Sequence, residues 1–176
     1  MIKNNPETKV YFFDEGRFGL QPALGRRWAR KGERPIINVK LGYENFYVFS
    51  AVCPTTGEDV SLFLPWVNTE MMNIFIEHLR AELNGRQCFL ILDCAGWHNF
   101  KELQIPPNTK LVFLPPYSPE LNPVERLWDW LKRNTIRNRF FQTLDEVMDS
   151  VEEYMRATTT NMKKSMCGCN YILYYK

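Results

Sequence analysis

Three carboxylates occupy positions from which they could hold divalent metal ions. Asp14 follows an apolar run at 9–13, and Asp93 follows a second apolar run at 88–92. Such runs are typical of strands that are buried on both faces of a sheet. Because sites in open α/β sheets form at the carboxyl ends of strands, we expect these two aspartates to converge if their strands are neighbours. Glu125, which begins a later amphipathic segment, could complete the set.

The chemistry follows from crowding three carboxylates into a small volume. Like charges raise one another's pKa, so the three side chains can stay ionised together only beside cations. Mg²⁺ or Mn²⁺ suit oxygen ligands, and two such ions roughly 3.5–4 Å apart stabilise the attacking and leaving oxygens of phosphoryl transfer. The sequence therefore indicates nuclease chemistry in which water or a DNA 3′-hydroxyl attacks. The competing interpretation is that the two aspartates only begin turns and that Glu125 only closes a capping box on Asn122.

The elements that must position these carboxylates predict an α/β fold with a mixed central sheet. The β segments that follow the first strand are separated by turns, which favours an antiparallel meander. A helix then runs to Leu83 from a cap at Asn68 or Thr69, and Asn84 and Gly85 end it. Strands separated by helices favour parallel pairing later in the chain. The strands are expected at 9–13, 36–40, 46–52, 59–64, 88–92 and 110–114.

Two further helices are predicted near the carboxyl end of the chain. Asn122 caps the first of them, with Pro123 at its opening position and Glu125 three residues after the cap. Its apolar stripe includes Trp128 as a packing residue, while Glu125 lies off that stripe. The last helix starts at a capping box formed by residues 143–146. We expect one catalytic domain over residues 1–160 and a tail of uncertain structure over residues 161–176.

Composition limits the chain to an ordinary globular class. Its 176 residues fit one domain, and 45% hydrophobic and 14% aromatic residues suit a packed core. The five cysteines are scattered, unlike those of a disulfide scaffold or a zinc site, so we expect reduced thiols. No apolar run is long enough for a membrane span, and the chain opens on polar residues. We therefore expect a cytoplasmic location, with nucleoid association in a prokaryote.

Positive charge is concentrated in two stretches, although the net charge is only +2. Clustered Lys and Arg could line a phosphate track on DNA, and the competing interpretation is that they form solvated loop and helix faces. The candidate DNA contacts are Arg26, Arg27, Arg30 and Lys31 in the first stretch, and Arg126, Lys132 and Arg133 in the second.

Four segments form a set of motifs: FFDEGRFG at 12–19, WARKG at 28–32, LDCAGWH at 92–98 and LPPYSPELNPVERLW at 114–128. Together they resemble one family, the DDE transposases of the mariner-like insertion-sequence superfamily. The last segment is the most specific, and the resemblance spans nearly the whole chain. It implies a ribonuclease-H-like, integrase-like fold and the activity of an endonuclease-type polynucleotidyl transferase. Such an enzyme cuts DNA at the ends of its element and joins the freed 3′-hydroxyl to target DNA, often at a TA dinucleotide.

The resemblance also implies which side chains hold the two Mg²⁺ or Mn²⁺ ions. The family's ligands correspond to Asp14, Asp93 and Glu125, the same residues that the strand and helix patterns favour. His98 could support Asp93 or act as a base, although its pattern is also typical of an ordinary loop histidine. We expect three further side chains to lie next to the ligands and support them: Glu15, His98 and Asn122.

The chain departs from the family pattern in three respects. Cys94 stands where Asn is common, and the interval from Asp93 to Glu125 is slightly short. The chain also begins almost at the first catalytic strand, without room for the helix-turn-helix region that reads transposon ends. We therefore interpret it as the cutting half of a transposase, whether a fragment, a second reading frame or a relic.

Three classes of function compete for this sequence. The favoured one is a transposase catalytic domain that pairs two DNA ends as a homodimer in a synaptic complex. The alternative is a catalytically silent or truncated transposase-derived protein that only binds DNA or another partner. A ribonuclease-H-like nuclease or resolvase outside transposition is disfavoured by the long proline-rich motif.

Overall fold

A five-stranded mixed sheet organises the chain in the computed structural model, which describes residues 8–21, 23–26, 28–34, 36, 42–93 and 102–168. Its strands are β1 (Lys9–Gly19), β2 (Asn45–Val52), β3 (Asp59–Leu64), β4 (Cys88–Leu92) and β5 (Thr109–Phe113). They lie in the order β3-β2-β1-β4-β5. The first three strands pair antiparallel, whereas β4 pairs parallel with both β1 and β5. This topology confirms the predicted mixed sheet, with antiparallel strands first and parallel strands later.

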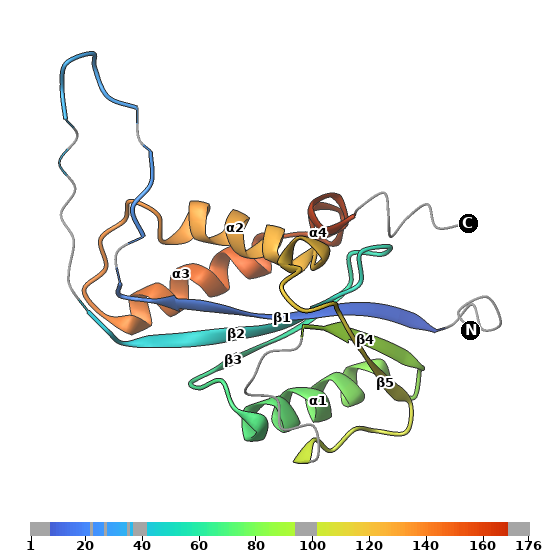
Figure 1. The fold of residues 1–176 in the computed structure, drawn as a ribbon. Coiled ribbons are helices and arrows are strands. Elements are labelled where there is room, and N and C mark those ends of the chain that lie inside the picture. Colours follow the sequence, from blue (N-terminus) through green and yellow to red (C-terminus); the bar gives the residue numbers. More distant parts are fainter. Residues whose placement is uncertain are drawn as a thin grey trace.

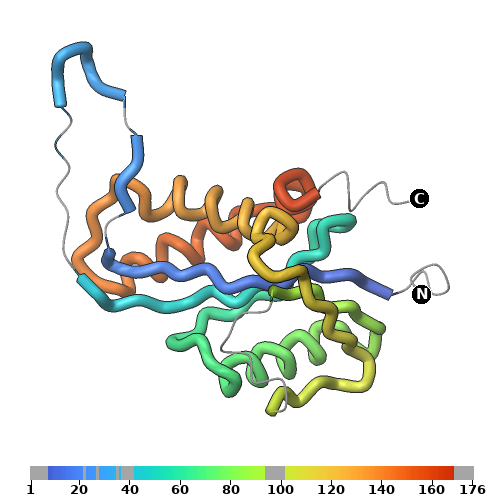
Figure 2. Tube along the Cα trace, in the orientation of Figure 1, coloured from blue at the N-terminus to red at the C-terminus, as the bar shows by residue number. Residues whose placement is uncertain are grey.

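Helices cover both faces of the sheet (Figures 1 and 2). The face below the sheet in Figure 1 is covered by α1 (Thr69–Leu83), and the other face carries α2 (Val124–Thr135), α3 (Leu144–Ala157) and α4 (Thr160–Cys167). Side chains alternate along β1, so Phe13 lies in the core between the sheet and α1, whereas Phe12 lies in the core between the sheet and the helices α2 and α3. Side chains at even positions of β1 therefore face the α2 layer.

β1 extends past the position at which the sequence predicted its end. The apolar run stops at Phe13, but the strand continues because residues 12–19 pair with β2, from Phe12 opposite Val52 to Gly19 opposite Asn45. β4 pairs only with residues 9–12 of β1. Asp14 therefore lies inside β1 rather than at its carboxyl end, close to where the pairing with β4 stops.

Most other elements lie where the sequence predicted them. β3 and β4 have the predicted bounds, and the Asn68 side chain caps α1 by accepting a 2.8 Å hydrogen bond from the backbone N–H of Met71. β5 begins one residue earlier than predicted and is a half-exposed edge strand, not a fully buried one. In the predicted strand at 36–40, Ile36 is exposed and lies outside any strand, and residues 37–40 lie outside the described residues.

The short helix α4 occupies part of the segment that the sequence pattern left without an assigned structure. Its Lys163 ammonium lies 2.6 Å from the carboxylate of Asp59 in β3, and both side chains are largely buried. A Cβ atom at Gly57 would lie 1.9 Å from the carbonyl oxygen of Thr160, so this turn accepts α4 only because it carries no side chain. These contacts fasten α4 to the turn between β2 and β3.

Cys53, Cys88 and Cys167 are buried, while Cys94 and Cys169 lie outside the described residues. Within the described part of the chain, none of the helices combines the length and the apolar content that crossing a membrane would require.

Candidate functional site

Asp14 and Asp93 both lie just past the point at which two adjacent parallel strands stop pairing. The register of β1 and β4 pairs Phe12 with Ile91, and each aspartate follows its partner of that pair by two residues. Side chains two residues apart in a strand point to the same side, so Asp14 faces the α2 layer, as Phe12 does. Asp93 is the first residue after β4 and is exposed. Strand register thus places both aspartates two residues beyond the last β1–β4 pair, at the same edge of the sheet.

A buried polar contact brings the start of α2 to the same place. The Asn122 side-chain amide donates a 2.9 Å hydrogen bond to the carbonyl oxygen of Phe13, the residue before Asp14. Its Oδ1 atom accepts a 3.2 Å hydrogen bond from the backbone N–H of Val124, the first residue of the helix. Asn122 is only 4% exposed, so both bonds form away from water and are costly to break. Asn122 therefore ties the amino end of α2 to β1.

The backbone of Asn122 decides between two interpretations of Glu125. In a capping box, the glutamate side chain would accept the N–H of the cap residue. That N–H instead donates to the carbonyl oxygen of Pro119, at 2.9 Å, in the 3-10 turn η3 (Pro119–Leu121). The helix itself begins one residue later than predicted, with Pro123 at its cap. Glu125 lies exposed in the first turn of α2 without a capping role.

The environment of Asp14 disfavours a negative charge. Burial raises the pKa of its carboxyl well above the ordinary value of 3.8, and the charges of Glu125 and then Glu15 raise it further. The indole N–H of Trp128 acts in the opposite direction, and Asp93 adds a smaller repulsion. A divalent cation would relieve this repulsion, so the donor set fits Mg²⁺ or Mn²⁺.

Glu15 follows Asp14 in β1 and shares the repulsion. Burial, followed by the negative charge of Asp93, raises the pKa of Glu15 from 4.5 to about 8. Because side chains alternate along a strand, Glu15 leaves β1 on the side opposite to Asp14. The sequence analysis predicted Glu15 as a residue that supports the ligands. The structure links it to Asp93, whose negative charge contributes to the raised pKa of Glu15.

We expect the metal-free chain to lose stability as the pH rises from about 4.5 to about 8. In this window the folded chain keeps a proton on Glu15 that the unfolded chain has released. The free energy of unfolding then falls with increasing pH, by at most about 1.4 kcal/mol per pH unit for this group. Chemical denaturation in a chelating buffer at a series of pH values measures the slope. Glu15→Gln should reduce the slope to the contribution of Asp14, and an equal slope in both proteins would contradict the assignment.

Trp128 connects the core of α2 directly to Asp14. Its indole N–H donates a 2.9 Å hydrogen bond to Oδ2 of Asp14, and the ring is 2% exposed. The ring meets Phe18 edge-on, with centroids 6.1 Å apart. The sequence treated Trp128 only as a packing residue, although a buried indole needs an acceptor for its N–H. That requirement was the available signal that Trp128 contacts a polar group.

We expect Trp128→Phe to reduce metal affinity and metal-dependent activity about 10- to 100-fold, as is usual for residues that orient a ligand. Phenylalanine retains an aromatic ring in the core but cannot donate to Asp14. Isothermal titration with Mn²⁺ and a nicking assay would measure the two effects. A variant that lost stability while keeping wild-type Mn²⁺ affinity would show that Trp128 serves packing alone.

The three predicted ligands are brought to one edge of the sheet without forming a complete metal cage. Within the described ranges, no three Asp, Glu, His or Cys side chains are grouped closely enough to hold an ion. The ligand role of Asp14, Asp93 and Glu125 therefore stays a prediction. His98 and Cys94 lie outside the described residues.

The basic residues that were predicted to contact DNA fall into different environments. Arg133 is paired with Asp129 on the same helix, and Arg126 donates a 3.5 Å hydrogen bond to the carbonyl oxygen of Met166. Lys132 lies over the ring of Phe18, with its ammonium 5.9 Å from the centroid. The remaining candidates belong to the connection between β1 and β2: Arg26, Arg30 and Lys31 are exposed, and Arg27 lies outside the described residues.

Comparison with known proteins identifies related sequences. A stretch of 106 residues, 58% of the chain, is 45% identical to the uncharacterized protein y4pE/y4sA of Sinorhizobium fredii and covers 76% of it. Over 158 residues, 87% of the chain, 24% are identical to the insertion element IS630 uncharacterized 39 kDa protein of Shigella sonnei. The alignment covers 46% of that protein, so the chain spans about half the length of this relative.

Solved structures share the fold. The Mos1 transposase paired-end complex with left transposon end superposes with a TM-score of 0.68 at 14% identity, over 94% of this chain and 53% of that one. The mariner Mos1 paired-end complex with Mg gives a TM-score of 0.66 at 16% identity, over 90% of this chain and 51% of that one. These likenesses confirm the ribonuclease-H-like fold.

The family itself is shown by sequence. Residues 9–148, most of the chain, match the sequence profile described as DDE superfamily endonuclease. The segment includes all three predicted ligands and both strands that carry the aspartates. The resemblance to mariner-like insertion-sequence transposases is thereby confirmed, and the chain belongs to the DDE superfamily endonuclease family.

Proposed function

We propose that this chain is the catalytic domain of a cut-and-paste DNA transposase, with Asp14, Asp93 and Glu125 as its metal ligands. The observation that carries the proposal is the placement of these carboxylates: Asp14 and Asp93 both lie just past the end of the β1–β4 pairing, and the charge of Glu125 contributes to the raised pKa of Asp14. The reaction is cleavage of DNA at transposon ends followed by joining of the 3′-hydroxyl to target DNA. Relatives crystallised as paired-end complexes, with Mg or Mn in some of them, support DNA and divalent metal as partners.

The chain's own residues prepare the site for this reaction. Asn122 fixes the amino end of α2 on β1, and Trp128 holds Oδ2 of Asp14 by a hydrogen bond. Two Mg²⁺ or Mn²⁺ ions, when bound, would neutralise the carboxylates, polarise the phosphodiester and make the attacking hydroxyl more acidic. Asp14 stands on the central strand β1, Asp93 directly follows its neighbour β4, and Glu125 belongs to a helix whose amino end is hydrogen-bonded to β1, so rigid elements would position the ligands.

Two features of the proposal concern assembly and target choice. Two transposon ends have to be cut in concert, which favours a homodimer in a synaptic complex. The family's frequent use of a TA dinucleotide makes TA the first target to test. The Mos1 structures named as paired-end complexes support the pairing of ends.

A Mn²⁺-dependent nicking and strand-transfer assay on transposon-end DNA tests the proposal. The proteins compared are this chain alone, the chain joined to an upstream DNA-binding domain, Asp93→Asn, and Glu153→Gln as a matched loss of an exposed carboxylate on α3. We expect nicking by the wild-type proteins and by Glu153→Gln, and none by Asp93→Asn. Unchanged activity in Asp93→Asn would overturn the mechanism. DNA binding without cleavage in every protein would favour the catalytically silent alternative.

A further inference from the structure

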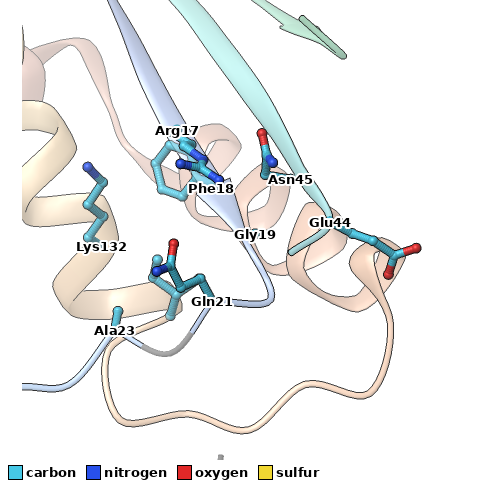
Figure 3. A pocket seen from close by; sticks show the side chains of 9 residues that line it. Arg17, Phe18, Gly19, Gln21, Ala23, Glu44, Asn45 and Lys132 are labelled. Atoms are coloured by element: carbon cyan, nitrogen blue, oxygen red, sulfur yellow. The ribbon is translucent and has the colours of Figure 1, made fainter. Parts of the chain in front are cut away.

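Polar side chains along the β1–β2 pair find their hydrogen-bond partners in two different ways. At the far end of β1, a cavity of about 240 Å³ is lined in part by Gln21 and Glu44, which are exposed and can bond to water (Figure 3). In the middle of the sheet, Ser50 of β2 is 0% exposed. Its hydroxyl group therefore depends on partners within the protein.

Ser50 begins a row of hydrogen bonds that crosses the sheet to α4. Its Oγ atom lies 2.8 Å from Oγ of Ser61, the residue opposite it in β3. Ser61 donates a 3.1 Å hydrogen bond to Oδ2 of Asp59, and the Lys163 ammonium donates a 2.6 Å hydrogen bond to Oδ1 of the same carboxylate. The row therefore links an ion pair on the edge strand β3 to a fully buried hydroxyl group.

The ion pair sets the direction of the hydrogen bonds in this row. Asp59 is paired with an ammonium group and acts only as an acceptor, so Ser61 donates its single hydroxyl proton to that carboxylate. The hydrogen bond between the two serines must then be donated by Ser50. The hydroxyl proton of Ser50 consequently points toward β3 and away from β1.

The row ends beside a predicted metal ligand. Asp14 is the residue of β1 that lies directly opposite Ser50. Directly opposite residues of antiparallel strands carry their side chains on the same face, with Cβ atoms about 4.5–5.5 Å apart. Oδ2 of Asp14 accepts the indole N–H of Trp128. Because Ser50 donates to Ser61, its proton is kept from Oδ1 of Asp14, the oxygen that would bind a cation.

We propose that Ser61 is a positioning residue for the metal site, because it holds the hydroxyl proton of Ser50 away from Asp14. The inference rests on the proposed function. Without the Ser61 hydroxyl, rotation about the Cα–Cβ bond of Ser50 would turn this proton toward the carboxylate on its other side, that of Asp14. A hydrogen bond to that carboxylate would compete with a cation for the same oxygen. Through the Lys163–Asp59 ion pair, α4 contributes to the metal site although it carries none of the predicted ligands.

Isothermal titration with Mn²⁺ tests the role of Ser61 independently of DNA cleavage. The variants are Ser61→Ala, Ser50→Ala, the two combined, and Ser61→Thr, which keeps a hydroxyl group. Ser150→Ala is the control, because it removes the hydroxyl group of a half-buried serine from α3. Chemical denaturation in a chelating buffer verifies that each variant is folded.

We expect Ser61→Ala to bind Mn²⁺ about tenfold more weakly than the wild type, at the lower end of what is usual for residues that orient a ligand. Removing the second hydroxyl group should restore the affinity. The double variant should bind Mn²⁺ as tightly as Ser50→Ala, and about tenfold more tightly than Ser61→Ala. Ser61→Thr and Ser150→Ala should stay within about twofold of the wild type.

The restored affinity separates this role from packing, because packing defects at two neighbouring serines would add to one another. A double variant that binds Mn²⁺ as weakly as Ser61→Ala would overturn the inference, and so would wild-type affinity in Ser61→Ala. If Asp93→Asn abolished nicking at the same time, the proposed function would stand and this inference alone would be refuted. A wild-type chain that does not bind Mn²⁺ would overturn both.

Discussion

Asp14→Asn is expected to lower metal-dependent nicking by roughly a thousandfold or more and to stabilise the metal-free chain at the same time. The loss follows from removing an anionic oxygen ligand, because a bound cation supplies several kcal/mol of transition-state stabilisation. The gain follows from removing a charge that burial, Glu125 and Glu15 all oppose. The amide keeps an oxygen that can accept the indole N–H of Trp128, so the packing of α2 is retained.

The two halves of this prediction need separate measurements. Nicking rates in Mn²⁺ give the catalytic effect, and chemical denaturation in a chelating buffer at pH 8 gives the stability of the metal-free chain. Glu153→Gln, which removes an exposed carboxylate from α3, should change neither quantity. Nicking within tenfold of the wild type would contradict the ligand role. A variant that lost both activity and stability would identify Asp14 as a structural residue instead.

The two aspartates illustrate what local patterns can and cannot reveal. The strand before Asp93 was predicted with its bounds because it is a short, uninterrupted apolar run. The run before Asp14 was predicted equally well, but its continuation was not, since Glu15, Gly16 and Arg17 interrupt the apolar pattern. The second half of β1 is stabilised by pairing with β2, which a local pattern does not encode.

The contacts that organise the site join residues far apart in sequence. Trp128 reaches Asp14 across 114 positions, and Asn122 reaches Phe13 across 109. Helical periodicity correctly buried Trp128 in the face of α2, but it could not identify the acceptor of the indole N–H. Periodicity fixes which side of an element is buried, whereas the partner depends on how the elements pack.

The basic residues show the same limit for charge. Counting Lys and Arg in windows selected Arg133, which is paired with Asp129 one helical turn before it. It also selected Arg126, whose side chain donates a 3.5 Å hydrogen bond to the carbonyl oxygen of Met166. A ligand is attracted by the charge that remains after ion pairs have formed within the protein. Which ion pairs form depends on the folded chain and cannot be read from a local count of charges.

Gly16→Ala is expected to destabilise the chain by about 1–3 kcal/mol, the usual cost of overpacking a filled core. A Cβ atom at Gly16 would lie 2.8 Å from Cδ2 and Cε3 of Trp128 and 2.9 Å from Cε2 of Phe18. The indole would have to move away from β1, and its hydrogen bond to Asp14 would be strained or lost. Activity should therefore fall at least as far as in Trp128→Phe, because both the ring position and the bond change.

A double-mutant cycle separates this steric mechanism from a general weakening of β1. If the added methyl group acts through the indole, Gly16→Ala should cost less in a Trp128→Phe background, where the smaller ring leaves space beside the strand. The two single variants and the double variant would be compared by chemical denaturation and by Mn²⁺ titration. Purely additive losses would show that Gly16 matters for the strand backbone and not for the position of Trp128. Non-additive losses in both measurements would show that Gly16, Trp128 and Asp14 act as one packed unit. In that unit the missing side chain of Gly16 lets α2 lie close enough to β1 for Trp128 to reach the Asp14 carboxylate.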